Sequence, residues 1–139
     1  MRHARLPIVV VDNVQDVQRP CVRFDPVPGL RDALKHLLDL GHRKLLWVGP
    51  RDARPTSRES TVYALAFEFG LTGSTCRIEM PVGARIGTSQ THDLVEAAVA
   101  DVLRQPGRDW TALVAYSDLF AVGALRAVGR AGWRVPEDL

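Results

Sequence analysis

The stretch LLDLGHRKLLWVGP, residues 37–50, contains the end of one predicted element and the whole of the next. Apolar residues at helical spacing stop at Gly41, and glycine is the residue that most often takes the left-handed conformation that ends a helix. A second apolar run follows at once and predicts a strand over residues 44–49. That strand stops at a Gly-Pro corner, and the arginine-rich loop RDARPTSR, residues 51–58, comes next.

The same alternation extends in both directions from this stretch. The unbroken β-branched run LPIVVVD, residues 6–12, suits a strand that is buried on both faces. Further strands are predicted over residues 20–24, 75–80 and 111–116. Helices are predicted from Asp25-Pro26 to Gly41, from the capping box at residues 56–59 to Gly70, from the apolar face beginning at Leu94 to Pro106-Gly107, and from a cap at Ser117 or Asp118 to Gly132.

Strands that alternate with helices across short loops indicate one fold class. Such an order predicts an α/β protein with right-handed crossovers, in which a three-layer arrangement places helices on both faces of a parallel sheet. The length of 139 residues and the hydrophobic content of 46% are ample for one such core, and they exclude a disordered chain.

Charge and cysteine usage exclude several classes of protein. The net charge of +2 and the lack of a Lys/Arg run argue against a nucleic-acid-binding tail. The two cysteines, Cys21 and Cys76, have no metal-binding spacing and are interpreted as thiols of a cytosolic protein. No apolar stretch approaches the roughly 18 residues that a membrane span needs. Asp12 interrupts the N-terminal apolar run and no small-residue cleavage site follows it, so we do not expect a signal peptide.

Polar residues follow the carboxyl ends of the predicted strands, where ligands bind in open parallel sheets. Asp12 ends the first strand, and Ser117 with Asp118 ends the strand at 111–116. Arg58 begins the helix after the arginine-rich loop, where backbone N–H groups favour anions and polar oxygens. Residues 81–90, PVGARIGTSQ, are the loosest segment and are a plausible binding loop.

Four segments resemble one family in its own order along the chain. They are LPIVVVDN (6–13), ALKHLLDLGHRKLLWVGP (33–50), SRESTVYALAFEFGL (57–71) and TALVAYSDLFAVGALRAVGRAGWRVPEDL (111–139). Together they resemble the effector-binding domain of LacI/GalR-family transcription regulators, which is built like a periplasmic sugar-binding protein. The resemblance implies a cytoplasmic module that senses a small-molecule effector, a sugar or sugar derivative.

The resemblance also implies a division of the chain. Residues 1–19 resemble a leading strand and linker from the first subdomain, and residues 20–139 resemble the second subdomain without its final strands. Because the family's helix-turn-helix is absent from this chain, we expect no operator binding by the chain alone. The edge of strand 111–116 is then expected to be bare, and we predict that PIVVVD or a neighbouring molecule shields it.

Individual site residues follow from the resemblance, each with an alternative. Arg58 matches a ligand-binding arginine whose planar fork can hold two sugar hydroxyls or a carboxylate; the alternative is a solvated arginine in the first helical turn. Ser117 matches a polar ligand contact, or it only caps its helix. Asp118 is more a first-turn carboxylate than a ligand residue, and Asp12 matches a hinge aspartate or simply ends a strand.

Arg54 departs from the family pattern, which usually has a small hydroxyl residue near it. With Arg51 and Arg58 it could favour an acidic or phosphorylated effector, but three arginines on a solvated loop are the simpler interpretation. A second departure is that residues 81–90 contain no Trp or Tyr, which weakens the expectation of an aromatic platform for a sugar ring.

Partners and rival functions complete the sequence-based hypothesis. Leu119, Val122 and Leu125 are candidates for a homodimer interface, unless they face their own sheet. We expect no metal, no cofactor and no catalysis, because no Ser-His-Asp order, GxSxG or Gly-rich phosphate motif is present. The rivals are a periplasmic sugar-binding protein of the same fold and a small α/β or flavodoxin-like enzyme.

Overall fold

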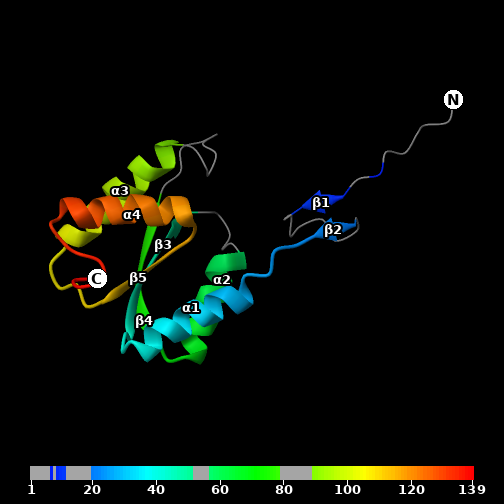
Figure 1. The fold of residues 1–139 in the computed structure, drawn as a ribbon, viewed down its shortest axis with the longest axis horizontal. Coiled ribbons are helices and arrows are strands. Elements are labelled where there is room, and N and C mark those ends of the chain that lie inside the picture. The colour runs from blue at the N-terminus through cyan, green and yellow to red at the C-terminus, as the bar shows by residue number, and fades with distance from the viewer. Residues whose placement is uncertain (1–6, 8, 12–19, 52–56, 79–88) are drawn as a thin grey trace.

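A computed structural model describes residues 7, 9–11, 20–51, 57–78 and 89–139. Two short strands come first and an alternating series of helices and strands follows (Figure 1). The elements are β1 (Val10–Val11), β2 (Cys21–Val22), α1 (Val27–Asp39), β3 (Lys44–Pro50), α2 (Ser57–Glu68), β4 (Thr72–Ile78), α3 (Ser89–Arg104), β5 (Ala112–Ala115) and α4 (Asp118–Arg130).

The main sheet has the order β4-β3-β5, and both pairings are parallel. Helices α1 and α2 lie on one face of this sheet and α3 and α4 lie on the other (Figure 1). The predicted α/β class with helices on both faces of a parallel sheet is therefore confirmed. Since all three strands run the same way, their carboxyl ends share one edge, and that edge positions the site described below.

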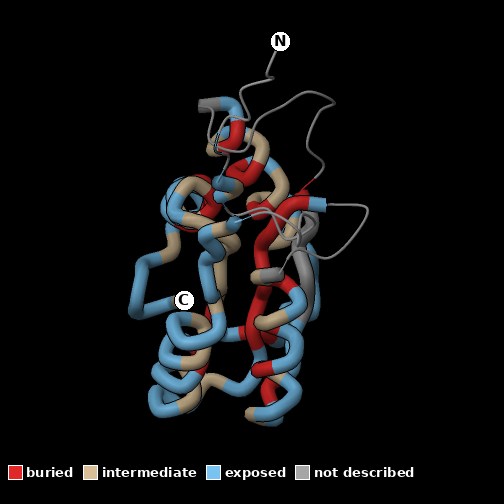
Figure 2. The backbone as a smooth tube through the Cα atoms, turned by 90° about the vertical axis from the view of Figure 1, so that its right-hand side faces the viewer, coloured by how far each residue is buried: buried red, intermediate tan, exposed pale blue. Residues whose placement is uncertain are grey.

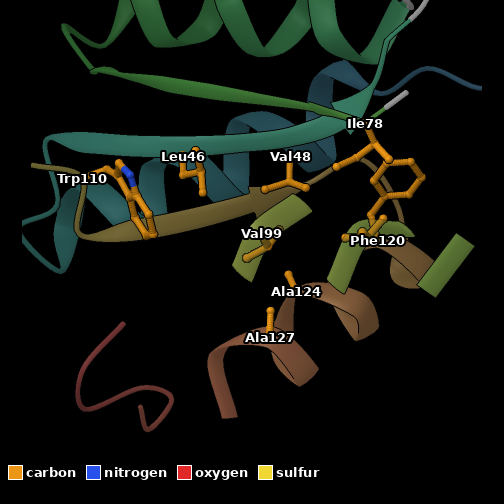
Figure 3. Packing of buried hydrophobic residues seen from close by; sticks show 9 residues of the cluster. Leu46, Val48, Ile78, Val99, Trp110, Phe120, Ala124 and Ala127 are labelled. Atoms are coloured by element: carbon orange, nitrogen blue, oxygen red, sulfur yellow. The ribbon is translucent and has the colours of Figure 1, made fainter. Parts of the chain in front are cut away.

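The core consists of two clusters, one on each face of the sheet, because side chains along a strand alternate in direction. Leu46 and Val48 of β3 pack toward α3 and α4, together with Ile78 and Phe120 (Figure 3). Leu45 of β3 packs toward α1 and α2 in the second cluster. Figure 2 shows the resulting pattern, with buried backbone along the sheet and exposed outer helix faces.

Most predicted element boundaries agree with the structure to within two residues, but β1 comprises only Val10–Val11 among its described residues, α3 begins at Ser89 and not at Leu94, and the start of β4 also differs. Gly41 has a φ of +93° after α1, as the left-handed cap requires. Strand β4 begins at Thr72 rather than Thr75, so the predicted start was wrong by three residues. A Cβ at Gly73 would lie 1.7 Å from the Leu45 carbonyl oxygen, so this early part of β4 depends on a glycine that lets two backbones approach.

Strands β1 and β2 form a separate parallel pair, with Val10 opposite Cys21. Val9 and Val11 are 60% and 71% exposed, so the predicted burial of this run on both faces is wrong for its described residues. An unbroken β-branched run is typical of a strand with a packed layer on each face, but the described residues provide no such layer for β1.

The segment PIVVVD was predicted to shield the outer edge of β5. This is wrong for its described residues, because β1 pairs with β2 and not with β5. A groove of about 400 Å³, here called the edge groove, follows β5 between α1 and α4. Val135, Pro136 and Leu139 of the C-terminal turn line it. Shielding by a neighbouring molecule stays a prediction.

The opposite end of the body, where the strands begin, is held by an arginine shared between two indoles. The Arg108 guanidinium carbon lies 5.0 Å from the centre of the Trp110 ring and 3.8 Å from that of Trp133. This contact joins the start of β5 to the C-terminal turn. No helix in the described part of the chain is both long enough and apolar enough to cross a bilayer.

Candidate functional site

A hollow of about 400 Å³ lies at the carboxyl ends of the strands, where the linker before α1 meets the start of α2 and of α4. This hollow is the candidate site. Its position agrees with the general rule that open parallel sheets bind ligands beyond their strand tips. It is lined by Phe24, Pro26, Gly29, Leu30, Arg58, Tyr116, Ser117 and Asp118.

Arg58 is the second residue of α2, and it is half-buried. Its Nη1 donates a hydrogen bond of 3.4 Å to the carbonyl oxygen of Tyr116, which follows β5. Its guanidinium carbon lies 5.0 Å from the centre of the Tyr116 ring and 5.2 Å from that of Phe24. The guanidinium is therefore held by neighbouring residues. The alternative interpretation, a solvated arginine in the first helical turn, does not describe it.

Ser117 occupies the N-cap position of α4 with an extended backbone, φ −154° and ψ 173°. Its side chain makes no capping hydrogen bond, although the sequence allowed for one. The Ser117 hydroxyl oxygen is buried and has no hydrogen-bond partner among the described residues. A buried hydroxyl without a partner is costly, and it has the chemistry to pair with a ligand hydroxyl.

Asp118 lines the same hollow and is exposed. Its Oδ1 accepts a hydrogen bond of 2.9 Å from the backbone N–H of Leu119, in the first turn of α4. Among the lining residues there is one cation, Arg58, and one anion, Asp118, so the described wall of the hollow has no net charge.

The structure thus brings Arg58, Ser117 and Asp118 to one hollow. Two other predicted site residues, Arg54 and Asp12, lie outside the described residues, as do Thr56 of the capping box and most of the loop 81–90. Arg51 is described and exposed, and its backbone N–H donates to the Ile78 carbonyl oxygen at 2.8 Å.

Sequence reasoning missed the two aromatic residues of the hollow, Phe24 and Tyr116. The family resemblance placed the aromatic platform in the loop 81–90. Tyr116 directly precedes Ser117 at a strand tip, which is a usable signal because the strand end itself was predicted. Phe24 also ends a predicted strand, but β2 stops at Val22, and it is the path of the linker from β2 to α1 that brings Phe24 to Arg58.

The three predicted interface residues lie on α4. Val122 and Leu125 are 39% and 53% exposed, and Leu119 is half-buried. The buried face of α4 is formed instead by Phe120, Ala124, Ala127 and Val128. Val122 and Leu125 are therefore not needed to cover the sheet of their own chain.

A second hollow, of about 800 Å³, lies along the outer faces of α3 and α4. Among its charged residues, Glu96 pairs with Arg130 and Asp101 pairs with Arg104, while Asp93 pairs at 3.7 Å with Arg126, which is not among the lining residues. It lies away from the strand tips, where open parallel sheets bind their ligands, so the hollow at Arg58 is the better candidate. No cluster of three His, Cys, Asp or Glu residues suited to a metal ion occurs within the described ranges.

Sequence comparison matches the family described as "Periplasmic binding protein-like domain" over residues 34–139. The HTH-type transcriptional regulator MalR of Streptomyces coelicolor is 32% identical over 145 aligned positions, which cover 100% of this chain and 40% of that regulator. The chain therefore spans less than half the length of this relative.

Solved structures of similar fold include a LacI family transcriptional regulator from Arthrobacter sp. FB24, with a TM-score of 0.78 and 26% identity over 95% of this chain and 45% of that one. A complex of a LacI family transcriptional regulator from the same source with lactose also has a TM-score of 0.78, at 24% identity over 95% of this chain and 47% of that one.

Proposed function

The chain belongs to the family of periplasmic binding protein-like domains, in the form found in LacI-family transcription regulators, and from this membership we propose that it is the effector-sensing part of such a regulator. The hollow at Arg58 forms one wall of the effector site. The effector is a small hydroxylated molecule, a sugar or sugar derivative.

One observation carries the ligand-binding part of this proposal. The buried Ser117 hydroxyl has no partner in the part of the chain that the structure describes, and Ser117 lines the same hollow as Arg58. A hydroxyl that can both donate and accept, placed beside a fork of N–H donors, matches the paired hydroxyls of a sugar. An occupant of the hollow would give the Ser117 hydroxyl the hydrogen bond that it lacks.

The charge of the described wall supports a neutral ligand over a phosphorylated one. Arg58 and Asp118 offset each other, and a phosphate would meet the Asp118 carboxylate at the mouth of the hollow. A similar structure holds lactose, a neutral disaccharide. Lactose is accordingly the first probe that we would test.

The organisation of the whole protein is part of the same proposal. We place residues 1–19 in the first subdomain and residues 20–139 in the second, with the pairing of β1 and β2 at the junction between them. The relatives are named as helix-turn-helix regulators, which supports DNA binding by a segment other than these residues and an action in the cytoplasm. Exposed Val122 and Leu125 on α4 support homodimer formation.

A binding role is also preferred over catalysis. The relatives are transcriptional regulators, and the hollow combines an arginine, a hydroxyl and an aspartate without a histidine or cysteine beside them. A secreted sugar-binding protein of the same fold is the remaining rival, and DNA binding that responds to a sugar would decide against it.

Titration calorimetry tests the proposal, with lactose, maltose and glucose 6-phosphate as probes. We expect a neutral sugar to bind, and we expect Arg58→Ala to weaken that binding about tenfold to a hundredfold, because a charge-assisted hydrogen bond is lost. Ser117→Ala should weaken it by a smaller factor. An Arg58→Ala variant that binds the sugar as tightly as the wild type would remove the hollow from the effector site.

Arg31→Ala is the matched control. Arg31 also lies over an aromatic ring, with its guanidinium carbon 5.6 Å from the centre of Phe69, but it does not line the hollow. Its replacement should leave the sugar affinity unchanged. An equal loss in both variants would point to a general effect of removing a stacked arginine.

A further inference from the structure

Arg58 touches two aromatic rings that come from opposite ends of the chain. Phe24 lies in the linker between β2 and α1, and Tyr116 follows β5. The guanidinium carbon is 5.2 Å from the first ring centre and 5.0 Å from the second, both within the range of a cation–π contact. We call these three residues the Arg58 cluster.

Phe24 is placed where packing alone gives it little reason to be. It is 60% exposed and belongs to neither of the two core clusters. Because hydrophobic stabilisation is proportional to the apolar area removed from water, this exposed ring contributes little to the stability of the fold through burial. We therefore take the contact with the Arg58 guanidinium as the main interaction of the Phe24 side chain.

Within the described ranges, Arg58 uses only part of its hydrogen-bonding capacity. A guanidinium has five N–H donors, and among the described residues one of them bonds to the Tyr116 carbonyl oxygen. A cation–π contact is an attraction between the positive charge and the ring, and it uses no hydrogen-bond donor. The cluster thus holds the guanidinium in place while N–H donors stay available to an occupant of the hollow.

We propose that Phe24 and Tyr116 are positioning residues for Arg58, which hold its guanidinium at the hollow so that its N–H donors meet the paired oxygens of a bound effector. As a statement about effector binding this rests on the proposed function, but the positioning itself exists without ligand. Phe24 then adds to affinity through Arg58 and not by stacking on the ligand.

The first experiment uses no ligand. In NMR spectra of the protein with ¹⁵N-labelled arginine, ring currents should displace the Nε–Hε signal of Arg58. Phe24→Leu should move that signal toward those of exposed arginines, whereas the aromatic variant Phe24→Tyr should retain its position. Val22→Ala is the matched control, because Val22 is 61% exposed on the adjoining strand and takes no part in the cluster. An Arg58 signal that is the same in Phe24→Leu and in the wild type would overturn the inference.

The second experiment is a double-mutant cycle on lactose affinity. Phe24→Leu should weaken binding by about twofold to thirtyfold, the range that cation–π contacts span, and Phe24→Tyr should restore it. In an Arg58→Met background, Phe24→Leu should have no additional effect. An equal loss in both backgrounds would mean that Phe24 touches the ligand directly, and it would overturn the inference.

The two experiments fail in different ways. If lactose and the other sugars do not bind, the proposed function fails, and the NMR displacement still decides whether the cluster positions Arg58. Thermal unfolding of each variant supplies the structural baseline. Because Phe24 is exposed, its variants should unfold within a few degrees of the wild type.

Discussion

Gly123 lies on α4 where that helix packs against α3. A Cβ at this position would be 2.7 Å from the His92 carbonyl oxygen and 2.7 Å from the Val95 Cβ, so only a glycine fits without movement. We expect Gly123→Ala to lower the free energy of unfolding by about 1–3 kcal/mol, as overpacking typically does. Urea denaturation measures this change directly.

Gly129 on the same helix is the control for that substitution. Nothing lies within 4 Å of a Cβ built at Gly129, so the helix propensity of alanine acts alone there. Gly129→Ala should raise the free energy of unfolding by up to about 1 kcal/mol. If both variants changed stability in the same direction, the close approach of α3 and α4 would not be the cause.

The residues of the candidate site differ in how far the sequence could predict them. The positions of Arg58 and Ser117 near strand tips follow from local rules, whereas their ligand-binding roles were predicted from the family resemblance. The Arg58 cluster does not, since its aromatic members are brought together by the path of a linker and by the pairing of β5 with β3. Local periodicity carries no information on such a meeting.

Helices α1 and α2 are joined by an ion pair between Arg31 and Glu68, with Nη2 donating to Oε2 at 3.0 Å. The hydrogen bond from Arg31 lowers the pKa of Glu68 below its ordinary value of 4.5. The contribution of this pair to stability is therefore full above about pH 4.5 and is lost as the pH falls through the folded-state pKa.

The prediction concerns the difference in Tm between the wild type and Glu68→Gln. We expect a small difference in favour of the wild type at pH 7, one that shrinks below pH 4.5. The variant Arg31→Gln removes the other partner of the same ion pair, so its difference in Tm from the wild type should show the same pH dependence. Thermal scans from pH 3 to pH 7 make the measurement, and a difference that grows on acidification would contradict the assignment.

Among the elements, amphipathic helices and the central strand were predictable because their own side chains carry the period of the element. The start of β4 was not, since Thr72, Gly73 and Ser74 are not apolar and are held as strand by parallel pairing with β3. The burial of β1 was wrongly predicted for a related reason. Its β-branched residues favour a buried strand, but the layers that would bury it must be supplied by other parts of the protein.

For the molecule as a whole, α4 and the edge groove present an apolar surface that the described residues leave open. Leu125 lines that groove and is 53% exposed. If the proposed homodimer uses this surface, Leu125→Glu should raise the dimer dissociation constant about thirtyfold or more, because it places a charge at a buried contact. Sedimentation equilibrium gives the constant.

Phe67→Glu on α2 is the control for this prediction. Phe67 is 90% exposed, on the other face of the sheet from α4, so the same charge there should leave the dimer intact. Two variants that dissociate alike would instead reflect the added charge itself. A wild-type protein that sediments as a monomer would remove the homodimer from the proposal.

The arginine shared by Trp110 and Trp133 has a practical consequence for anyone observing this protein by its own fluorescence. Both indoles lie at the end of the body where the strands begin. The hollow lies at the opposite end, where the Tyr116 ring centre is 5.4 Å from that of Phe120. In the core cluster, Trp110 and Phe120 are at opposite ends (Figure 3). The third indole, Trp47, is shielded inside the sheet and only 4% exposed. An unchanged tryptophan emission during a ligand titration would therefore not show that the hollow is empty. A changed emission would mean that ligand binding at the strand tips alters the structure at the opposite end of the body.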